Sequence, residues 1–228
     1  MSRSLAGLLL AGVSVLSASA AEPAPGKPVY GEGRMLVLVS PQFPAAALAK
    51  GETGKVDVFG TIRTDGSLEN VRIETSPPNE SFESAVMNVV PLWRLQPRIV
   101  TPDCGAASTK GQVTIWFELD GGKPKVSYGT RPPPGTAPPA IHIDRRPIRT
   151  VTPNYPAKLA QDPKAPKSMV QVAYVAVAED GAVTGVTLAP MLYYRDFEPN
   201  IVAAMRQWKF EQQVQAWCGE FEMVLAMQ

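Results

Sequence analysis

The chain has 228 residues, of which 45% are hydrophobic and 19% are charged, and its formal net charge is only +1. This length and composition suffice to bury hydrophobic cores. The 22 basic and 21 acidic residues are scattered rather than clustered, which argues against a surface for nucleic acid or anionic lipid.

The first residues, 1–20, have the pattern of a secretory signal peptide. One early charge, Arg3, precedes the apolar stretch 5–16, and small residues follow at Ala18-Ser19-Ala20. We expect cleavage near Ala21. An uncleaved membrane anchor is the alternative, but serines interrupt the apolar stretch, which is short for a span of roughly 20 apolar residues.

The stretch 54–93 predicts a β-hairpin followed by a helix. Apolar and polar residues alternate from Val56 to Arg63, which is typical of a strand with one buried face. Asp65-Gly66 favours a tight turn, and the alternation resumes at Val71.

Helices are predicted on both sides of this hairpin. Pro44 suits the first turn of a short helix, and Gly51 suits its end. After the hairpin, apolar residues recur at the spacing of one helix face, namely Phe82, Ala85, Val86, Val89 and Trp93. Pro91 is expected to kink or end this helix. A further strand at 112–119 completes an α-β-β-α-β order.

The same order returns in the second half of the chain. A hairpin is predicted at 169–188 around Asp180-Gly181, a helix at 197–208 and a last strand at 220–227. Trp208 ends its helix as Trp93 ends the earlier one. We interpret this recurrence as an internal duplication.

The predicted fold class is therefore α+β, with two tandem α-β-β-α-β units. Each unit is expected to be a three-stranded antiparallel sheet packed by two helices. The expected division is a signal peptide at 1–20, a disordered leader at 21–34, a first domain at 35–120, a proline-rich linker at 121–147 and a second domain at 148–228.

The linker contains Pro132-Pro133-Pro134 and Pro138-Pro139. Proline-rich segments are stiff and extended, so we expect a connector between the two domains. The alternative is a proline-rich ligand for the groove of another protein.

The two cysteines, Cys104 and Cys218, follow the two repeat tryptophans at nearly the same spacing. In an exported chain two cysteines commonly pair, and this pair would join the two domains. The alternative is a buried thiol in each domain, because the sequence does not provide the distance between them.

The pattern as a whole resembles the C-terminal domain of the TonB family, the periplasmic energy transducers of Gram-negative bacteria. The first repeat carries the resemblance at Pro41, Phe43-Pro44, Ala47, Gly54, Val56, Val58, Asp65-Gly66, Val71, Ile73, Phe82, Ala85, Trp93-Arg94 and Pro97. The second repeat is similar at Pro153, Tyr155-Pro156, Val170, Val172, Asp180-Gly181, Val186, Leu188 and Trp208-Lys209-Phe210.

The resemblance implies a periplasmic protein that binds an extended peptide of an envelope protein, such as an outer-membrane receptor, by strand addition. Such binding needs an open sheet edge, and the last strand of each repeat is the candidate. In the first repeat the candidate edge consists of Gln112, Val113, Thr114, Ile115, Trp116, Phe117 and Glu118. The alternative is that the other repeat covers this edge.

A true transducer of this family carries an inner-membrane anchor and a long proline-rich span. The expected cleavable signal and short linker of this chain favour a binding or scaffolding module. An anchored transducer remains the alternative if the first segment is not cleaved.

No catalytic or metal motif stands out, and we expect no cofactor and no enzyme activity. His142 lies beside the linker without a neighbouring nucleophile, so we interpret it as solvated or as part of a strand pair. Asp65 and Asp180 are interpreted as turn residues, and Trp93 and Trp208 as core residues. The alternative from another class is an exported hydrolase whose acidic residues meet only in three dimensions.

Overall fold

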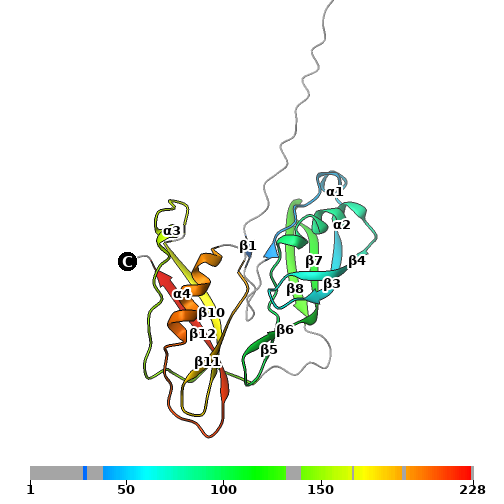
Figure 1. Ribbon diagram of the computed structural model, residues 1–228. Coiled ribbons are helices and arrows are strands. Elements are labelled where there is room, and N and C mark those ends of the chain that lie inside the picture. Colours follow the sequence, from blue (N-terminus) through cyan, green and yellow to red (C-terminus); the bar gives the residue numbers. More distant parts are fainter. Residues whose placement is uncertain (1–27, 30–37, 132–139, 166, 192–193, 227–228) are drawn as a thin grey trace, which may run out of the picture.

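The computed structural model describes residues 28–29, 38–131, 140–165, 167–191 and 194–226. The expected signal peptide and Pro132-Pro133-Pro134 lie outside these residues. Within them the chain forms two α+β units that lie side by side, the first over residues 38–131 and the second over 141–226 (Figure 1).

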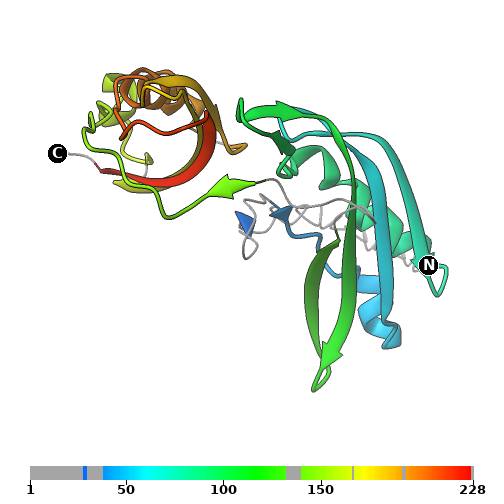
Figure 2. The same cartoon turned by 90° about the horizontal axis from the view of Figure 1, so that it is seen from below.

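The first unit is built on a four-stranded antiparallel sheet in the order β4-β3-β7-β8. Its strands are β3 (Gly54–Ile62), β4 (Leu68–Ser76), β7 (Thr109–Asp120) and β8 (Lys123–Arg131). The β7–β8 hairpin projects beyond the helices of this unit (Figure 2). Alternating apolar residues of the strands turn towards the helix layer.

The helix layer of the first unit contains α1 (Ala45–Lys50), α2 (Glu80–Met87) and the 3₁₀ turn η1 (Val90–Leu92). The side chain of Asn79 caps α2 by accepting from the N–H groups of Ser81 and Phe82. As Pro91 predicted, the regular helix ends before Trp93, which follows the 3₁₀ turn.

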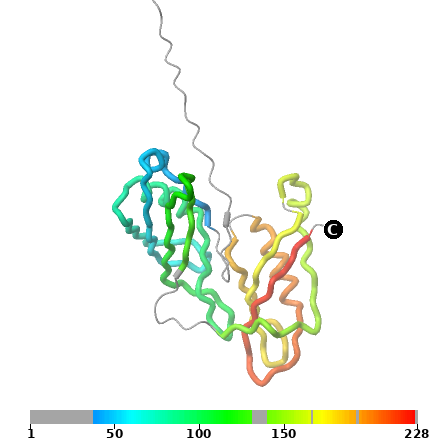
Figure 3. The backbone as a smooth tube through the Cα atoms, turned by 180° about the vertical axis from the view of Figure 1, so that it is seen from behind, coloured from blue at the N-terminus to red at the C-terminus, as the bar shows by residue number. Residues whose placement is uncertain are grey.

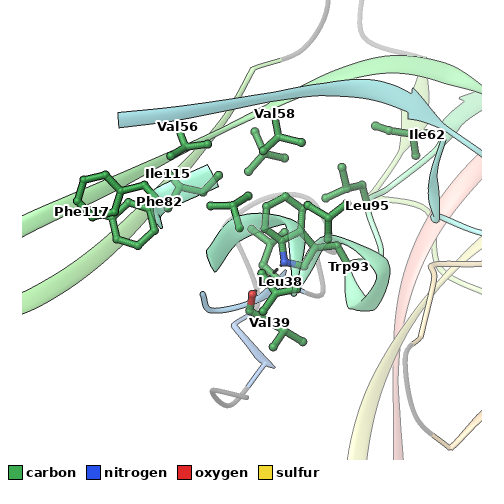
Figure 4. Packing of buried hydrophobic residues seen from close by; sticks show 14 of the residues in the cluster. Leu38, Val39, Val56, Val58, Ile62, Phe82, Trp93, Leu95, Ile115 and Phe117 are labelled. Carbon is green, nitrogen blue, oxygen red and sulfur yellow. Dashed lines mark hydrogen bonds between the residues drawn. The ribbon is translucent and has the colours of Figure 1, made fainter. Parts of the chain in front are cut away.

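Trp93 lies at the centre of the first core. Its side chain is fully buried among residues of β3, β7 and the helices, and its indole nitrogen points to Val39 (Figure 4). Phe82 stacks on Phe117 with ring centroids 4.5 Å apart, which joins α2 to β7.

The second unit has a sheet in the order β11-β10-β12-β9. Its strands are β9 (Ile141–His142), β10 (Ser168–Val177), β11 (Val183–Leu188) and β12 (Trp217–Ala226). One face is covered by α3 (Ala157–Ala160), the 3₁₀ turn η2 (Arg195–Phe197) and α4 (Glu198–Met205).

The two units repeat the same turn. Gly66 and Gly181 have φ angles of 81° and 80°, which only glycine adopts readily. The Gly66 carbonyl accepts from the N–H of Leu95 at 2.8 Å, and the Gly181 carbonyl accepts from the N–H of Phe210 at 2.9 Å.

The two tryptophans also repeat one hydrogen bond. Nε1 of Trp93 donates to the Val39 carbonyl at 2.9 Å, and Nε1 of Trp208 donates to the Val151 carbonyl at 3.0 Å. Equivalent side chains thus fix the segment before each first helix to the end of each second helix.

The α+β class is confirmed, but the main sheet of each unit has four strands rather than three. The extra strands, β8 and β9, both come from the range 121–147, which was expected to be a connector. Each adds to the last strand of its unit, β8 along nearly the whole of β7 and β9 at only two residues of β12.

A hairpin of β5 (Arg98–Val100) and β6 (Gly105–Ala107) joins the units (Figure 1). Cys104 in its turn forms a disulfide with Cys218, with Cα atoms 5.4 Å apart. The bond lies in an apolar cluster against the face of β10 opposite the helices, formed by Ile99, Val172, Tyr174, Ala176 and Ala189.

The short strand β1 (Pro28–Val29) precedes the first unit and pairs with its first strand, β2 (Leu38–Val39). Among the described helices, none combines the length and the hydropathy that spanning a lipid bilayer requires.

Candidate functional site

The edge predicted in the first unit is not open. Gln112 to Glu118 pair with β8 on one side, and Gln112 to Phe117 pair with β3 on the other. The prediction that this range is an edge is wrong, because Gly121 and Gly122 adopt positive φ and turn the chain back along β7.

Side chains also fix β8 to β7. Val126 and Tyr128 pack against the first core. A Cβ atom on Gly129 would lie 2.9 Å from the ring of Trp116, so the missing side chain of Gly129 allows the indole to lie over β8. Of the predicted edge residues, Val113, Ile115 and Phe117 are buried in the core.

Gln112 and Thr114 converge on a buried carboxylate, Asp57 of β3. Its Oδ1 accepts from Thr114 Oγ1 at 2.5 Å and from Gln112 Nε2 at 3.1 Å, and its Oδ2 lies 2.7 Å from Lys55 Nζ. Burial by itself raises the pKa of Asp57, but the contacts with Lys55, Thr114 and Gln112 outweigh it, so that the pKa lies below its ordinary value. These residues tie two central strands together.

We expect Asp57→Ala to lower the free energy of unfolding by about 1–3 kcal/mol at pH 7. Because the folded-state pKa is depressed, this stabilisation is present above the unfolded-state pKa of Asp57 and is lost as the pH falls through the folded value. Urea unfolding of both proteins at pH 7 and near pH 3 measures it. A difference that stays the same at both pH values would contradict the role of the charge.

Three of the outer strands of the two sheets are protected. On β4, Arg72 pairs with Glu74, and Glu69 pairs with Arg63 at 2.8 Å. β8 begins with Lys123-Pro124-Lys125, and lysine and proline are residues that keep an edge from pairing. β11 lies against β6 of the first unit.

The fourth edge is formed by the short strand β9 and, beyond it, by β12, which is open along most of its length. β9 pairs only with Cys218 and Gly219. From Glu220 to Ala226, β12 pairs with β10 on one side, and within the described part of the chain nothing pairs with it on the other.

The extended chain between β9 and α3 passes along this side of β12 (Figures 1 and 3), but it is bonded to the helix layer. Ile148 N donates to the Lys209 carbonyl at 2.8 Å. Lys209 N donates to the Arg149 carbonyl at 3.0 Å. Among the described residues, no backbone hydrogen bond joins this segment to β12.

The register shows which residues of β12 carry these groups. The Val172 carbonyl accepts from Ala189 N at 2.9 Å, on the side of β11. Because backbone groups alternate sides along a strand, Ala173 turns to β12 and forms the hydrogen-bonded pair with Phe221. Glu222 and Val224 therefore direct their N–H and C=O groups to the open side.

A hollow of about 310 Å³ lies beside the end of this edge. It is lined by Thr152, Pro153, Asn154, Tyr155, Ala160, Val224, Leu225 and Ala226. On the face opposite the helices, Val224 is 67% exposed and its cross-strand neighbour Val170 is 51% exposed. The edge thus has apolar surface on both faces.

A difference between the two units accounts for this hollow. In the first unit, Phe43 packs edge-on against Phe117 of β7 with ring centroids 5.6 Å apart. In the second unit Tyr155 takes the place of Phe43, and the smaller Leu225 takes the place of Phe117 near the end of the strand. No full fourth strand covers the space here, as β8 does in the first unit.

Glu220 and Glu222 are two carboxylates on the same face of β12, the arrangement that the hydrolase hypothesis called for. Burial raises the pKa of Glu220, a hydrogen bond from Tyr174 lowers it, and the charge of Glu222 raises it further. Neither residue lines the hollow beside the end of β12.

His142 lies at the end of β9, as the strand-pair interpretation predicted. Its Nδ1 is 3.9 Å from Asp144 Oδ1, and its ring meets Trp217 edge-on with centroids 5.7 Å apart. Within the described residues, no group of three or more His, Cys, Asp or Glu side chains is arranged to hold a metal ion.

The sequence offers the last strand of each repeat as a candidate edge and favours the first repeat, whose last strand is covered by β8. The lining residues 152–155 could not be recognised from the sequence, because their similarity to 40–43 indicated only a repeat. The available signal is that Leu225 stands in the second repeat where Phe117 stands in the first, so that an aromatic ring is missing near Tyr155.

Residues 39–119 match the model of the family described as Gram-negative bacterial TonB protein C-terminal. Protein TonB of Escherichia coli (strain K12) is 33% identical over 105 residues, which are 46% of this chain and 41% of that protein. Protein TonB of Yersinia enterocolitica is 35% identical over 89 residues, 39% of this chain and 31% of that protein. Protein TonB of Pseudomonas aeruginosa is 34% identical over 59 residues, 26% of this chain and 17% of that protein. The chain spans less than half the length of these relatives.

Proposed function

We propose that this protein is a protein-interaction module of the Gram-negative envelope that binds an extended segment of a partner by strand addition, because residues 39–119 match the model of the TonB C-terminal family. The observation that carries the proposal is the edge of β12, unpaired from Glu220 to Ala226 among the described residues and bordered by a hollow. The second unit is then a divergent copy that retains the open edge.

The physical reason for binding here is the set of backbone groups on Glu222 and Val224. An incoming strand satisfies these groups with main-chain hydrogen bonds, while alternate side chains meet the two faces of the edge. One face offers Val224 and Val170, and the other offers the hollow beside Tyr155 and Leu225.

The first unit serves a different purpose in this proposal. Its last strand is covered by β8, and the β5–β6 hairpin and the disulfide attach it to the second unit. It supports the second unit and keeps one face of that sheet from water.

The partner class that the family suggests is a segment of an outer-membrane receptor or another envelope protein. The expected place of action is the periplasm, after export by the segment 1–20. Energy transduction would need a membrane anchor, which the alternative interpretation of that same segment supplies.

Proline substitution tests the site. Val224→Pro removes an N–H that points to the open side and leaves the hydrogen bonds to β10 in place, so we expect the fold to persist and peptide affinity to fall about tenfold or more. The probe is a randomised octapeptide library, whose selected members are measured by calorimetry. Hydrogen exchange at the Glu222 and Val224 amides should slow when a peptide is bound.

Val170→Pro is the matched control. Val170 is the exposed cross-strand neighbour of Val224, and its N–H points away from β12. This variant should bind as the unaltered protein does. Equal loss of affinity in both variants, or an unchanged affinity in Val224→Pro, would show that β12 is not the binding edge.

A further inference from the structure

An arginine lies where β9 leaves the edge of β12. Arg145 follows β9 closely in sequence, and its guanidinium lies over the ring of Trp217, 4.7 Å from the ring centroid. His142 of β9 meets the same ring edge-on. Trp217 is the first residue of β12, so these contacts hold the cation at the start of that strand.

This cation has no counter-ion in the described part of the chain. No described carboxylate lies within 4.0 Å of Arg145, and neighbouring Asp144 is placed near His142 instead. Nη1 of Arg145 and Nε1 of Trp217 are both buried and have no hydrogen-bond partner among the described residues. Buried donors without an acceptor are unfavourable, and a guanidinium fork matches a carboxylate.

The position of Arg145 determines which end of a peptide it meets. β9 occupies Cys218 and Gly219, so a peptide on the free stretch ends beside the last residue of β9. If the peptide runs antiparallel to β12, this end is its C-terminus, with a carboxylate. If it runs parallel, this end is its ammonium group, which the charge of Arg145 would repel.

We propose that the open edge of β12 takes the last residues of a partner protein, antiparallel to β12, with the terminal carboxylate bound by Arg145. The inference rests on the proposed function and adds the polarity and the chemical class of the ligand. Only the last residue of a chain has a free main-chain carboxylate. Binding of that carboxylate by Arg145 therefore determines which peptide residue lies opposite which residue of β12, that is, the register of the added strand.

The faces of β12 define the rest of the ligand. On the face of β12 opposite the helices, Glu220 and Glu222 come first along the free stretch, and Val224 follows. A basic side chain of the peptide, shortly before its C-terminus, would lie beside Glu220 and Glu222. An apolar side chain nearer to the N-terminus of the peptide would lie on Val224. On the other face, apolar side chains would enter the hollow beside Tyr155 and Leu225.

The test compares two forms of the same peptides on the full chain with its disulfide intact. Members selected from the octapeptide library are synthesised with a free C-terminal carboxyl group and with a C-terminal amide. We expect the free acids to bind about tenfold more tightly or better, since an Arg–carboxylate pair is a strong, charge-assisted contact. Arg145→Gln should remove this preference, and Arg145→Lys should keep part of it.

Arg146→Gln is the control, since it removes a neighbouring charge that does not lie over Trp217. It should retain most of the preference for the free acid. Equal binding of acids and amides by the unaltered protein would overturn the carboxylate site and leave strand addition standing. Failure of both forms to bind would overturn the proposed function itself.

Discussion

Replacing Trp93 with alanine is expected to lower the free energy of unfolding of the first unit by about 3–5 kcal/mol. The side chain is fully buried, and removing it leaves a cavity that its neighbours in the core fill only in part (Figure 4). The Val39 carbonyl also loses the hydrogen bond from Nε1. A loss of this size is a large part of the stability of a small domain.

Chemical denaturation followed by circular dichroism measures this loss. Trp93→Phe separates the two causes, because it keeps most of the ring volume and removes only the donor to Val39. Leu48→Ala is a control at a partly exposed site on α1, 36% exposed, and should change stability much less. If Trp93→Ala kept its stability but lost ligand binding, the residue would be a contact surface rather than a core residue.

Trp208 makes the matching prediction in the second unit. It donates the equivalent hydrogen bond to Val151 but is 8% exposed. Trp208→Ala should therefore destabilise at the lower end of the same range, about 3 kcal/mol.

The parts of the fold that local chemistry controls could be predicted from the sequence. Alternation along 56–63 fixed a strand with one buried face, and the glycine of each Asp-Gly turn does adopt positive φ. Pro91 ended α2 because proline lacks the amide donor that the helix needs. Both tryptophans are buried as predicted, but each lies beyond the end of its helix rather than within it, since α2 ends at Met87 and α4 at Met205.

The parts that depend on pairing between distant residues could not. β8 has only two apolar residues that reach the core, Val126 and Tyr128, and it begins with Lys123-Pro124-Lys125, so its composition indicated a connector. An edge strand needs little apolar alternation, since one side and one face are solvated. β9 is too short for any periodic signal and is fixed by pairing with Cys218 and Gly219.

The candidate site shows the same limit. The two repeats are similar, so each has a last strand to which another strand could add. The strand that remains open is decided by where β8 and β9 pair, and the sequence does not show this. The family resemblance favoured the first repeat because its motif is better preserved, and β8 closes that repeat. A well-preserved core motif indicates that the core packs in the same way. It does not indicate whether the next strand of the chain, here β8, covers the edge.

Removal of the disulfide is expected to lower the free energy of unfolding by about 2–5 kcal/mol. The bond closes a loop of 114 residues in sequence separation, so its loss releases much of the conformational freedom of the unfolded chain. The bond also holds the β5–β6 hairpin against Val172, Tyr174 and Ala176 of β10. Without it, this apolar cluster and the contacts of β6 with β11 and of the Gly66 turn with Pro190 must keep the two units together.

Cys104→Ser with Cys218→Ser is the variant to measure, because changing both residues leaves no unpaired thiol. On a non-reducing gel the unaltered protein should migrate faster than after reduction, and the double variant should show no such difference. In calorimetry we expect the single transition of the linked units to shift to lower temperature and to separate into two, since each sheet keeps its own core. One transition at the original temperature in the double variant would show that the junction is held by packing alone. In that case the first unit would support the β12 edge without help from the covalent bond.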